Sequence, residues 1–425
     1  MFAAIIIIFI LGYVCITLEH VIKINKSATA LITAGLCWTI YIFSGAPHEE
    51  VNSRLLEHLA DASGILFFLL GALTIVELID THDGFEIITG KITTTNKRKL
   101  LWIVCILTFF LSAILDNLTT TIVMLSLVRK MISAKADRLS FAGMIIIAAN
   151  AGGAWSPIGD VTTTMLWIGG QVTAPNIISK LILPSAVCLF VPLFFIARNT
   201  KGEVSKPASK VKTKTKREVF ESRLILVLGL GTLLFIPVFK TITHLPPFMG
   251  MLLSLGILWA VTEIIHKNKE DKDSFSVAAA LQKIDTPSIL FFLGILLAIG
   301  ALQSTGQLTD MAGWLSAKVP NINLLTISIG GLSAVVDNVP LVAAAQGMFS
   351  LQQYPTDHYF WEMIAYTTGT GGSILIIGSA AGVVAMGIEK INFTWYLKRF
   401  GLWALVGYLA GAIVYILQEK LLNLL

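Results

Sequence analysis

Leu111 to Asn117 reads Leu-Ser-Ala-Ile-Leu-Asp-Asn, and Leu332 to Asn338 reads Leu-Ser-Ala-Val-Val-Asp-Asn. Each stretch closes an apolar run with a carboxylate followed by a carboxamide. An Asp at bilayer depth costs about 3 kcal/mol or more. Two such residues at equivalent points of a repeated pattern, Asp116 and Asp337, therefore indicate a functional use of the pair.

The composition indicates a multispanning, all-α membrane protein. Of the 425 residues, 55% are hydrophobic and only 13% are charged, and the mean hydropathy is +0.78. A soluble globule needs more polar surface than this chain can supply. The net charge of +5 is concentrated in short loops without an Arg stripe interleaved with aromatic residues, so membrane lipids are expected partners and nucleic acid is not.

The basic loops predict how the apolar segments cross the membrane, because cytoplasmic loops are rich in Lys and Arg. Lys97 to Lys99 and Arg129 to Arg138 flank segment 100–131, so both of its ends are expected in the cytoplasm. Its length of roughly 30 residues exceeds one straight span and favours a re-entrant helical hairpin with its tip at Asp116 to Thr120. The same count predicts that hairpin 323–351 enters from the outside and that both termini lie outside. The apolar segments are 2–18, 28–44, 62–80, 100–131, 141–170, 178–197, 224–240, 248–265, 287–303, 323–351, 360–388 and 400–418.

A glycine-rich break follows each hairpin, from Asn150 to Asp160 and from Gly369 to Ser379. Gly152-Gly153 and Ile158-Gly159 align without a gap with Gly371-Gly372 and Ile377-Gly378. Since the two units have opposite expected orientations, we predict inverted-topology repeats, each with a re-entrant hairpin and a broken transmembrane helix. The predicted organisation is 1–54, N-terminal transmembrane helices; 55–198, first repeat, with hairpin 100–131 and broken helix 141–170; 199–223, cytoplasmic basic linker; 224–279, connecting transmembrane helices; and 280–425, second repeat, with hairpin 323–351 and broken helix 360–388.

The tips and the breaks together supply hard oxygen ligands. Backbone that leaves a helix at membrane depth is tolerated where it is buried in protein or lines a wet cavity. Carboxylate, amide, hydroxyl and freed carbonyl oxygens suit a small hard cation. The predicted ion-binding and transport residues are Asp116, Asn117, Thr119, Thr120, Asn150, Ser156, Asp160, Thr162, Asp337, Asn338, Ser373 and Ser379, and among them Asp116, Asp160, Asp337, Asn117 and Asn338 are the expected metal ligands.

Each of these features also has a purely structural interpretation. Asp-Asn before Thr-Thr is a good N-cap for the returning arm of a hairpin. The glycines can serve close helix packing, and Thr162 to Thr164 can bond back to the preceding helical turn. Repetition at symmetric depth, together with a third acid at Asp160, favours the ion site over capping alone.

These motifs resemble the NhaD-type sodium/proton antiporters of the ion transporter superfamily, and the resemblance covers nearly the whole chain. The most specific block runs from Asn150 to Thr163, supported by Asp116 to Thr121, Asp337 to Pro340, Gly371 to Ser373 and Ile377 to Gly382. The resemblance implies functional roles for Asp116, Asn117, Asn150, Asp160, Asp337, Asn338 and Ser373. The chain departs from the family pattern after Ser373, where Ile374 to Ile377 replace a further expected hydroxyl.

The function that the resemblance implies is exchange of cytoplasmic Na⁺, and of Li⁺ as a further candidate, for H⁺ in pH homeostasis. We expect the ions to compete for the shared carboxylates Asp116, Asp160 and Asp337. No enzymatic activity and no cofactor are expected. The alternative is an anion carrier of the same superfamily for dicarboxylate or arsenite, held at the helix N-termini of the tips, although an Asp at each tip would repel an anion. The expected location is a bacterial inner membrane, with a plastid envelope as the second choice. A homodimer is a further candidate, because dimers are common among related carriers.

Overall fold

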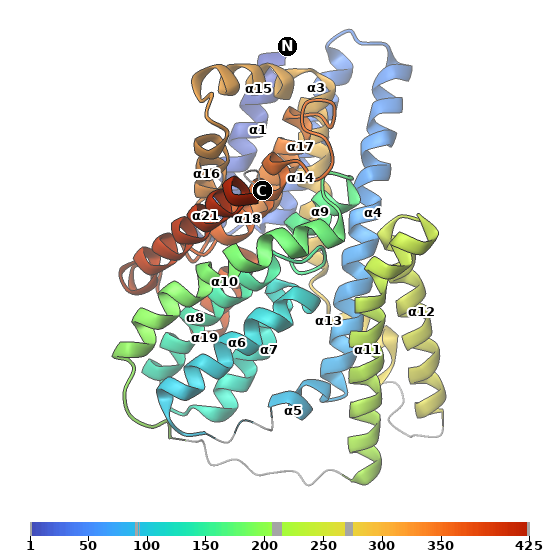
Figure 1. Ribbon diagram of the computed structural model, residues 1–425. Helices are drawn as coiled ribbons and strands as arrows, with labels where there is room; N and C mark the ends of the chain where they lie inside the picture. Colours follow the sequence, from blue (N-terminus) through green and yellow to red (C-terminus); the bar gives the residue numbers. More distant parts are fainter. Residues whose placement is uncertain (1, 90–91, 93, 206–214, 268–274, 423–425) are drawn as a thin grey trace.

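The computed structural model of the chain is built from helices throughout the part that it describes, which is every residue except 1, 90–91, 93, 206–214, 268–274 and 423–425 (Figure 1). Residues 206–214 of the predicted basic linker therefore lie outside the described residues. The helices of the first part are α1 (Phe2–Thr17), α2 (Glu19–Ile22), α3 (Lys26–Phe43), α4 (His48–Thr81), α5 (Gly84–Thr89), α6 (Lys97–Leu115), α7 (Asn117–Met131), α8 (Lys135–Gly153), α9 (Val161–Ile168) and α10 (Ala174–Asn199). The second part contains α11 (Lys216–Thr243), α12 (Pro247–His266), α13 (Val277–Lys283), α14 (Thr286–Ser304), α15 (Gln307–Lys318), α16 (Ile322–Leu332), α17 (Asn338–Met348), α18 (Tyr359–Gly371), α19 (Ala380–Glu389), α20 (Phe393–Tyr396), a π-helical turn (Leu397–Gly401) and α21 (Leu402–Leu422).

The described residues include eight helices that are long and apolar enough to cross a membrane. They are α3, α4, α6, α10, α11, α12, α14 and the continuous helix Phe393–Leu421, while Ala4–Thr17, α16 and α19 are shorter apolar helices. The prediction of an all-α polytopic membrane protein is confirmed. The inverted repeat and the division into domains remain predictions.

Local sequence signals set where several of these helices begin. The Asn96 side chain accepts a hydrogen bond from the Lys99 amide at 3.0 Å and caps α6. Thr215 and Glu218 form a reciprocal capping box at the start of α11. Proline occupies the first turn of α12 and α14, where its missing N–H is not needed for an intrahelical bond.

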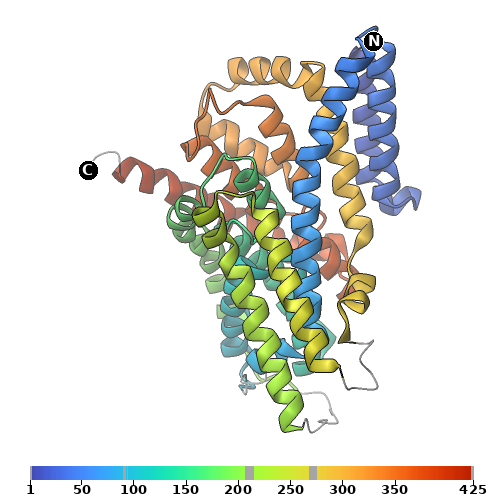
Figure 2. The same cartoon turned by 90° about the vertical axis from the view of Figure 1, so that its right-hand side faces the viewer.

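Two groups of helices pack mainly among themselves. The first contains α1, α3, α4, α11, α12 and α14 (Figures 1 and 2). In this group α3 packs against α1 and α14, α11 packs against α12, and α4 packs against α12 and α14. The second contains α6, α7, α8, α9, α10, α16, α17, α18, α19 and α21. The two meet chiefly where α17 lies against α14 and where α4 contacts α9. Both hairpins thus belong to the second group.

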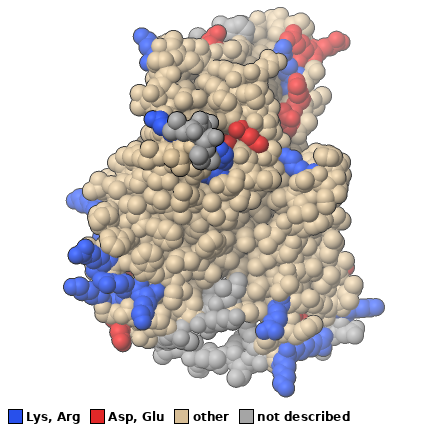
Figure 3. Space-filling model, viewed as in Figure 1, with Lys and Arg blue, Asp and Glu red and all other residues tan. Residues whose placement is uncertain are grey.

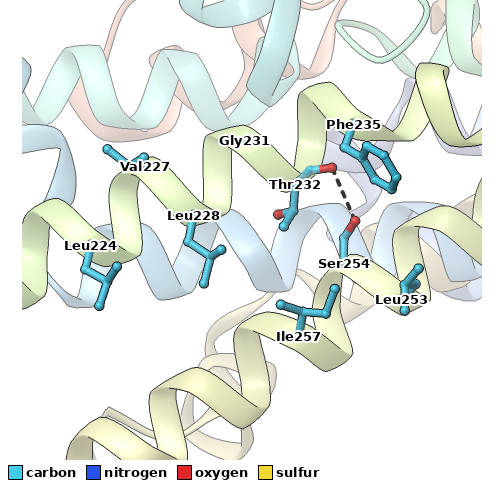
Figure 4. A pocket seen from close by; sticks show the side chains of 9 residues that line it. All are labelled: Leu224, Val227, Leu228, Gly231, Thr232, Phe235, Leu253, Ser254 and Ile257. Atoms are coloured by element: carbon cyan, nitrogen blue, oxygen red, sulfur yellow. Dashed lines mark hydrogen bonds between the residues drawn. The ribbon is translucent and has the colours of Figure 1, made fainter.

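The surface is apolar over a broad band, as a lipid-facing surface requires. In the view of Figure 3, Lys and Arg gather at the lower end, where α6 and α11 begin. By the positive-inside rule this end is predicted to face the cytoplasm. An open groove between α11 and α12 is lined by side chains such as Val227, Phe235 and Ile257 (Figure 4). The hydroxyl of Ser254 in this groove donates a hydrogen bond to the Thr232 carbonyl at 3.2 Å. This groove carries no charged group and is not part of the ion site.

The structure extends α4 well beyond its expected segment and adds the helix α15. Segment 62–80 is only the end of α4, which begins at His48 and runs for 34 residues, or about 50 Å at 1.5 Å per residue. The hydrophobic core of a bilayer is about 30 Å thick, so the polar first turns of α4 rise beyond it. The helix α15 was also missed, because its polar residues give it no apolar run.

Candidate functional site

The first hairpin turns at a single residue. Asp116 separates α6 from α7 with φ 82° and ψ 159°, a conformation that costs a residue with a side chain about 1–3 kcal/mol. Its Oδ1 accepts a hydrogen bond from the Thr119 amide at 2.8 Å, and its Oδ2 accepts one from the Thr119 hydroxyl at 2.7 Å. The carboxylate therefore caps α7, and the tip holds a strained geometry.

The second hairpin turns without such strain. Helix α16 ends at Leu332 and α17 begins at Asn338, and Asp337 has φ −50° and ψ 136°. The Asp337 carboxylate caps α17 by accepting from the Val339 amide at 3.3 Å. Its other oxygen lies 3.6 Å from the ammonium of Lys26, the first residue of α3.

Two further helix starts face the tips. Residues 154–160 interrupt the helix between α8 and α9, and residues 372–379 do so between α18 and α19. Asp160 caps α9 through Oδ1, which accepts from the Thr162 amide at 2.9 Å and from the Thr162 hydroxyl at 2.8 Å. Ser379 caps α19 by accepting from the Gly382 amide at 3.2 Å. The same position thus carries a carboxylate in the first half and a hydroxyl in the second.

Close packing of each broken helix on its hairpin explains the paired glycines. A Cβ on Gly152 would lie 2.2 Å from a backbone oxygen of α6, and a Cβ on Gly371 would lie 2.0 Å from a backbone oxygen of α16. The hydroxyl of Ser112 donates to a carbonyl of α8 at 2.6 Å, and that of Ser333 donates to a carbonyl of α18 at 3.1 Å. The contacts recur at matched positions of the two halves, which supports the repeat prediction.

One hydrogen-bond network joins both tips and both breaks. The Asn117 amide nitrogen donates to Asp160 Oδ2 at 2.5 Å and to Asn150 Oδ1 at 3.1 Å. The Asn338 amide nitrogen lies 3.4 and 3.5 Å from the two Asp160 oxygens. Asn150 in turn donates to the hydroxyls of Ser373 and Ser379, each at 2.9 Å. The residues of this network are all buried, and Asp160 is 1% exposed.

Comparison with known proteins places the chain among transporters. Residues 5–369 match a protein family described as "Citrate transporter". The chain is 46% identical to Sodium/proton antiporter 1 of Arabidopsis thaliana, over 97% of this chain and 72% of that protein. It is 43% identical to Sodium/proton antiporter 2 of the same plant, over 96% of this chain and 98% of that protein. It is 32% identical to the Na(+)/H(+) antiporter NhaD of Vibrio cholerae over 99% of this chain and 91% of that one. The chain belongs to the NhaD-type antiporter family. It is a transporter family and not a family of enzymes.

The NhaD-type chain does not bring its three expected carboxylates to one point. Asp116 and Asp337 lie close enough to Asp160 to repel it, yet one bonds within its own turn and the other pairs with Lys26. Among the described residues, no three His, Cys, Asp or Glu side chains are grouped so that they could hold a metal ion. The centre is instead one carboxylate, Asp160, surrounded by amides and hydroxyls.

The hydroxyl groups of the remaining expected ligands differ in their hydrogen-bond partners. Thr119 and Thr162 bond to the neighbouring capping carboxylates, and Ser156 donates to the Ala113 carbonyl at 2.5 Å, which fixes the break against α6. Thr120 is different, since its buried hydroxyl has no hydrogen-bond partner within the described part of the chain. An unpaired buried hydroxyl costs about 1–3 kcal/mol, so its position in the first turn of α7 suggests a ligand.

Lys26 is a partner of the site that the sequence motifs did not indicate. The structure places its side chain against the second hairpin tip. The one local signal was that Lys26 directly begins an apolar helix instead of lying within a loop.

Proposed function

We propose that this multi-pass membrane protein exchanges sodium ions for protons, with Asp160 at the centre of the site. The observation that carries the proposal is that amides from two hairpin tips, Asn117 and Asn338, converge on this one buried carboxylate. An unpaired charge in such surroundings is costly. Either a proton or a sodium ion removes that cost, and the two cannot do so together.

Competition at Asp160 means that sodium and a proton occupy the site in turn. Sodium entering from the cytoplasm displaces the proton, and protonation from the other side expels sodium. Each Asn side chain carries an oxygen beside its nitrogen, so rotation of the Asn117 or Asn338 amide turns an acceptor toward the cation. The Thr120 hydroxyl offers another oxygen. Asp116 and Asp337 tune the site by their charges and bind ions in turn, as part of the same proposal.

Alternating access follows from the two helix groups. The hairpins and the broken helices pack with α10 and α21, whereas α1, α3, α4, α11, α12 and α14 form the other group. We propose that the first set moves against the second and presents the site to each side in turn. Lithium as a second cation, a homodimer, and a bacterial inner membrane are finer proposals; the relatives come from a plant as well as from bacteria.

The test is sodium-dependent proton flux in everted membrane vesicles. Wild-type protein should collapse an imposed pH gradient when sodium is added, and Asp160→Asn and Asp116→Asn should each abolish this response. Asp310→Asn removes an acid of similar size from the exposed surface of α15 and should leave the flux unchanged. Unimpaired exchange in Asp160→Asn would reject the proposed role of that carboxylate.

An anion carrier is the second candidate, because the matching family is described as "Citrate transporter". The buried Asp160 has no cationic partner among the described residues, which opposes an anionic substrate, but a co-transported cation could offset it. Uptake of labelled citrate or of a dicarboxylate, with and without sodium, separates the two functions. Saturable uptake of the anion without sodium-dependent proton flux would favour the anion carrier.

A further inference from the structure

Lys26 joins a hairpin tip to a helix of the other packing group. Its ammonium lies 3.6 Å from Asp337 Oδ2 and 4.4 Å from the centre of the Phe291 ring on α14. The side chains of Lys26 and Asp337 are 24% and 19% exposed, so the pair is largely shielded. The Lys26 amide also donates to Glu19 Oε1 at 3.1 Å, which fixes the start of α3.

The pair distinguishes Asp337 from the other two carboxylates of the site. Within the described residues, neither Asp116 nor Asp160 forms an ion pair. Asp337 is also close to Asp160 and to the buried hydroxyl of Tyr13 on α1. Lys26 is thus the cationic partner of Asp337 in the described structure, and it belongs to a different group of helices.

We propose that Lys26 is a built-in competitor of the transported ions at Asp337. An ammonium and a sodium ion carry the same single charge, so each can satisfy the carboxylate. When the site is empty, Lys26 pairs with Asp337 and holds the second hairpin tip against α3. When sodium or a proton satisfies the carboxylates, the pair weakens and the hairpin can move. This inference rests on the proposed function and adds the residue that prevents the empty carrier from crossing.

The lysine therefore determines coupling and not only affinity. If the empty site crosses the membrane, sodium can leak without returning a proton. Removing the ammonium should release the tip and allow that leak. It should also remove one competitor for Asp337, so that sodium binds at lower concentration.

The experiment uses the full chain in proteoliposomes, with three variants. Lys26→Met removes the charge at similar length, Lys26→Arg keeps it, and Lys23→Met removes a charge from an exposed residue near the same end of α3. For Lys26→Met we expect the apparent KM for sodium to fall roughly fivefold, which corresponds to about 1 kcal/mol of ion-pair free energy. We also expect radioactive sodium to leave preloaded Lys26→Met vesicles without the acidification of the interior that coupled proton entry produces. Lys26→Arg and Lys23→Met should keep wild-type coupling.

Several results would overturn the proposal. A Lys26→Met protein with wild-type KM and no leak would show that the pair does not control coupling. Equal loss of flux in Lys26→Met and Lys26→Arg would assign Lys26 a structural role only. Lys26→Gln serves as a second neutral variant. If both neutral variants fail to accumulate in the membrane while Lys26→Arg accumulates, the role of Lys26 is likewise in folding. A wild-type protein without sodium-dependent proton flux would reject the proposed function as well, whereas active wild-type protein with an unaltered Lys26→Met rejects this inference alone.

Discussion

Gly330→Ala and Gly331→Ala form a matched pair that tests how packing of the second hairpin controls the site. Both residues lie in the last turns of α16. A Cβ on Gly330 would lie 2.3 Å from Thr367 Cβ and 2.5 Å from the Thr367 carbonyl carbon, whereas a Cβ on Gly331 would meet nothing within 4 Å. Carbon atoms pack best at about 3.5–4.0 Å, so Gly330→Ala must push α16 and α18 apart by roughly 1 Å. Overpacking of this kind costs about 1–3 kcal/mol.

The displacement should also reach the ion site. Asn338 begins α17, the other arm of this hairpin, and its 3.4 Å and 3.5 Å contacts with Asp160 are already long. A further shift of about 1 Å would break them. We expect Gly330→Ala to lower thermal stability in detergent and to raise the apparent KM for sodium. Gly331→Ala should match wild type or be slightly more stable, since Ala favours a helix over Gly by up to about 1 kcal/mol.

The assays are heating followed by size-exclusion chromatography, and sodium titration of proton flux in vesicles. Equal stability of the two variants would refute the packing argument. Reduced stability of Gly330→Ala with an unchanged KM would keep the packing argument but refute its link to Asn338.

Three further predictions concern the ligands, the competition and the cytoplasmic end. Thr120→Val should weaken sodium binding while leaving stability unchanged or improved, because it removes a hydroxyl that has no partner in the described part of the chain. Thr121→Val, which breaks a 2.7 Å bond to the Asn117 carbonyl, should instead reduce stability in the same melting assay. Competition for one carboxylate predicts that the apparent KM for sodium rises as pH falls, by about tenfold per pH unit once the carboxylate of the sodium-free protein is mostly protonated. Saturating sodium should restore the maximal rate. Sodium titrations at two pH values check this, and a fall in maximal rate at constant KM would contradict it. Glu389→Gln should destabilise the protein by about 2 kcal/mol, since the buried Glu389 accepts from Arg129 at 2.6 Å and from Arg138 at 3.2 Å, whereas Glu50→Gln in an exposed pair should change the melting temperature little.

The sequence predicted the parts of the site that depend on local pattern. The tips at Asp116 and Asp337 and the breaks before Asp160 and Ser379 all follow from short motifs at the ends of apolar runs. The hydrogen bonds that converge on Asp160 could not be predicted, because they depend on how separate helices pack. The sequence also could not show which residue of each Asp-Asn pair points toward Asp160. Both residues of the pair are polar, and only the geometry of the turn decides between them.

The ion pair of Lys26 illustrates the same limit over a longer distance. Nothing in the local sequence connects residue 26 with residue 337. The helix α4 was underestimated for a different reason: hydropathy reports the part of a helix that lies within lipid, and Glu49 and Glu50 belong to turns beyond it.

The backbone at Asp116 has a consequence for engineering this protein. With φ at 82° and ψ at 159°, the position favours an amino acid without a side chain, so Asp116→Gly would relax the turn and yield a more heat-resistant chain. That sturdier variant would lack the acid. A search for thermostable mutants that scores survival alone would therefore select against transport at this residue, and activity must be screened beside it.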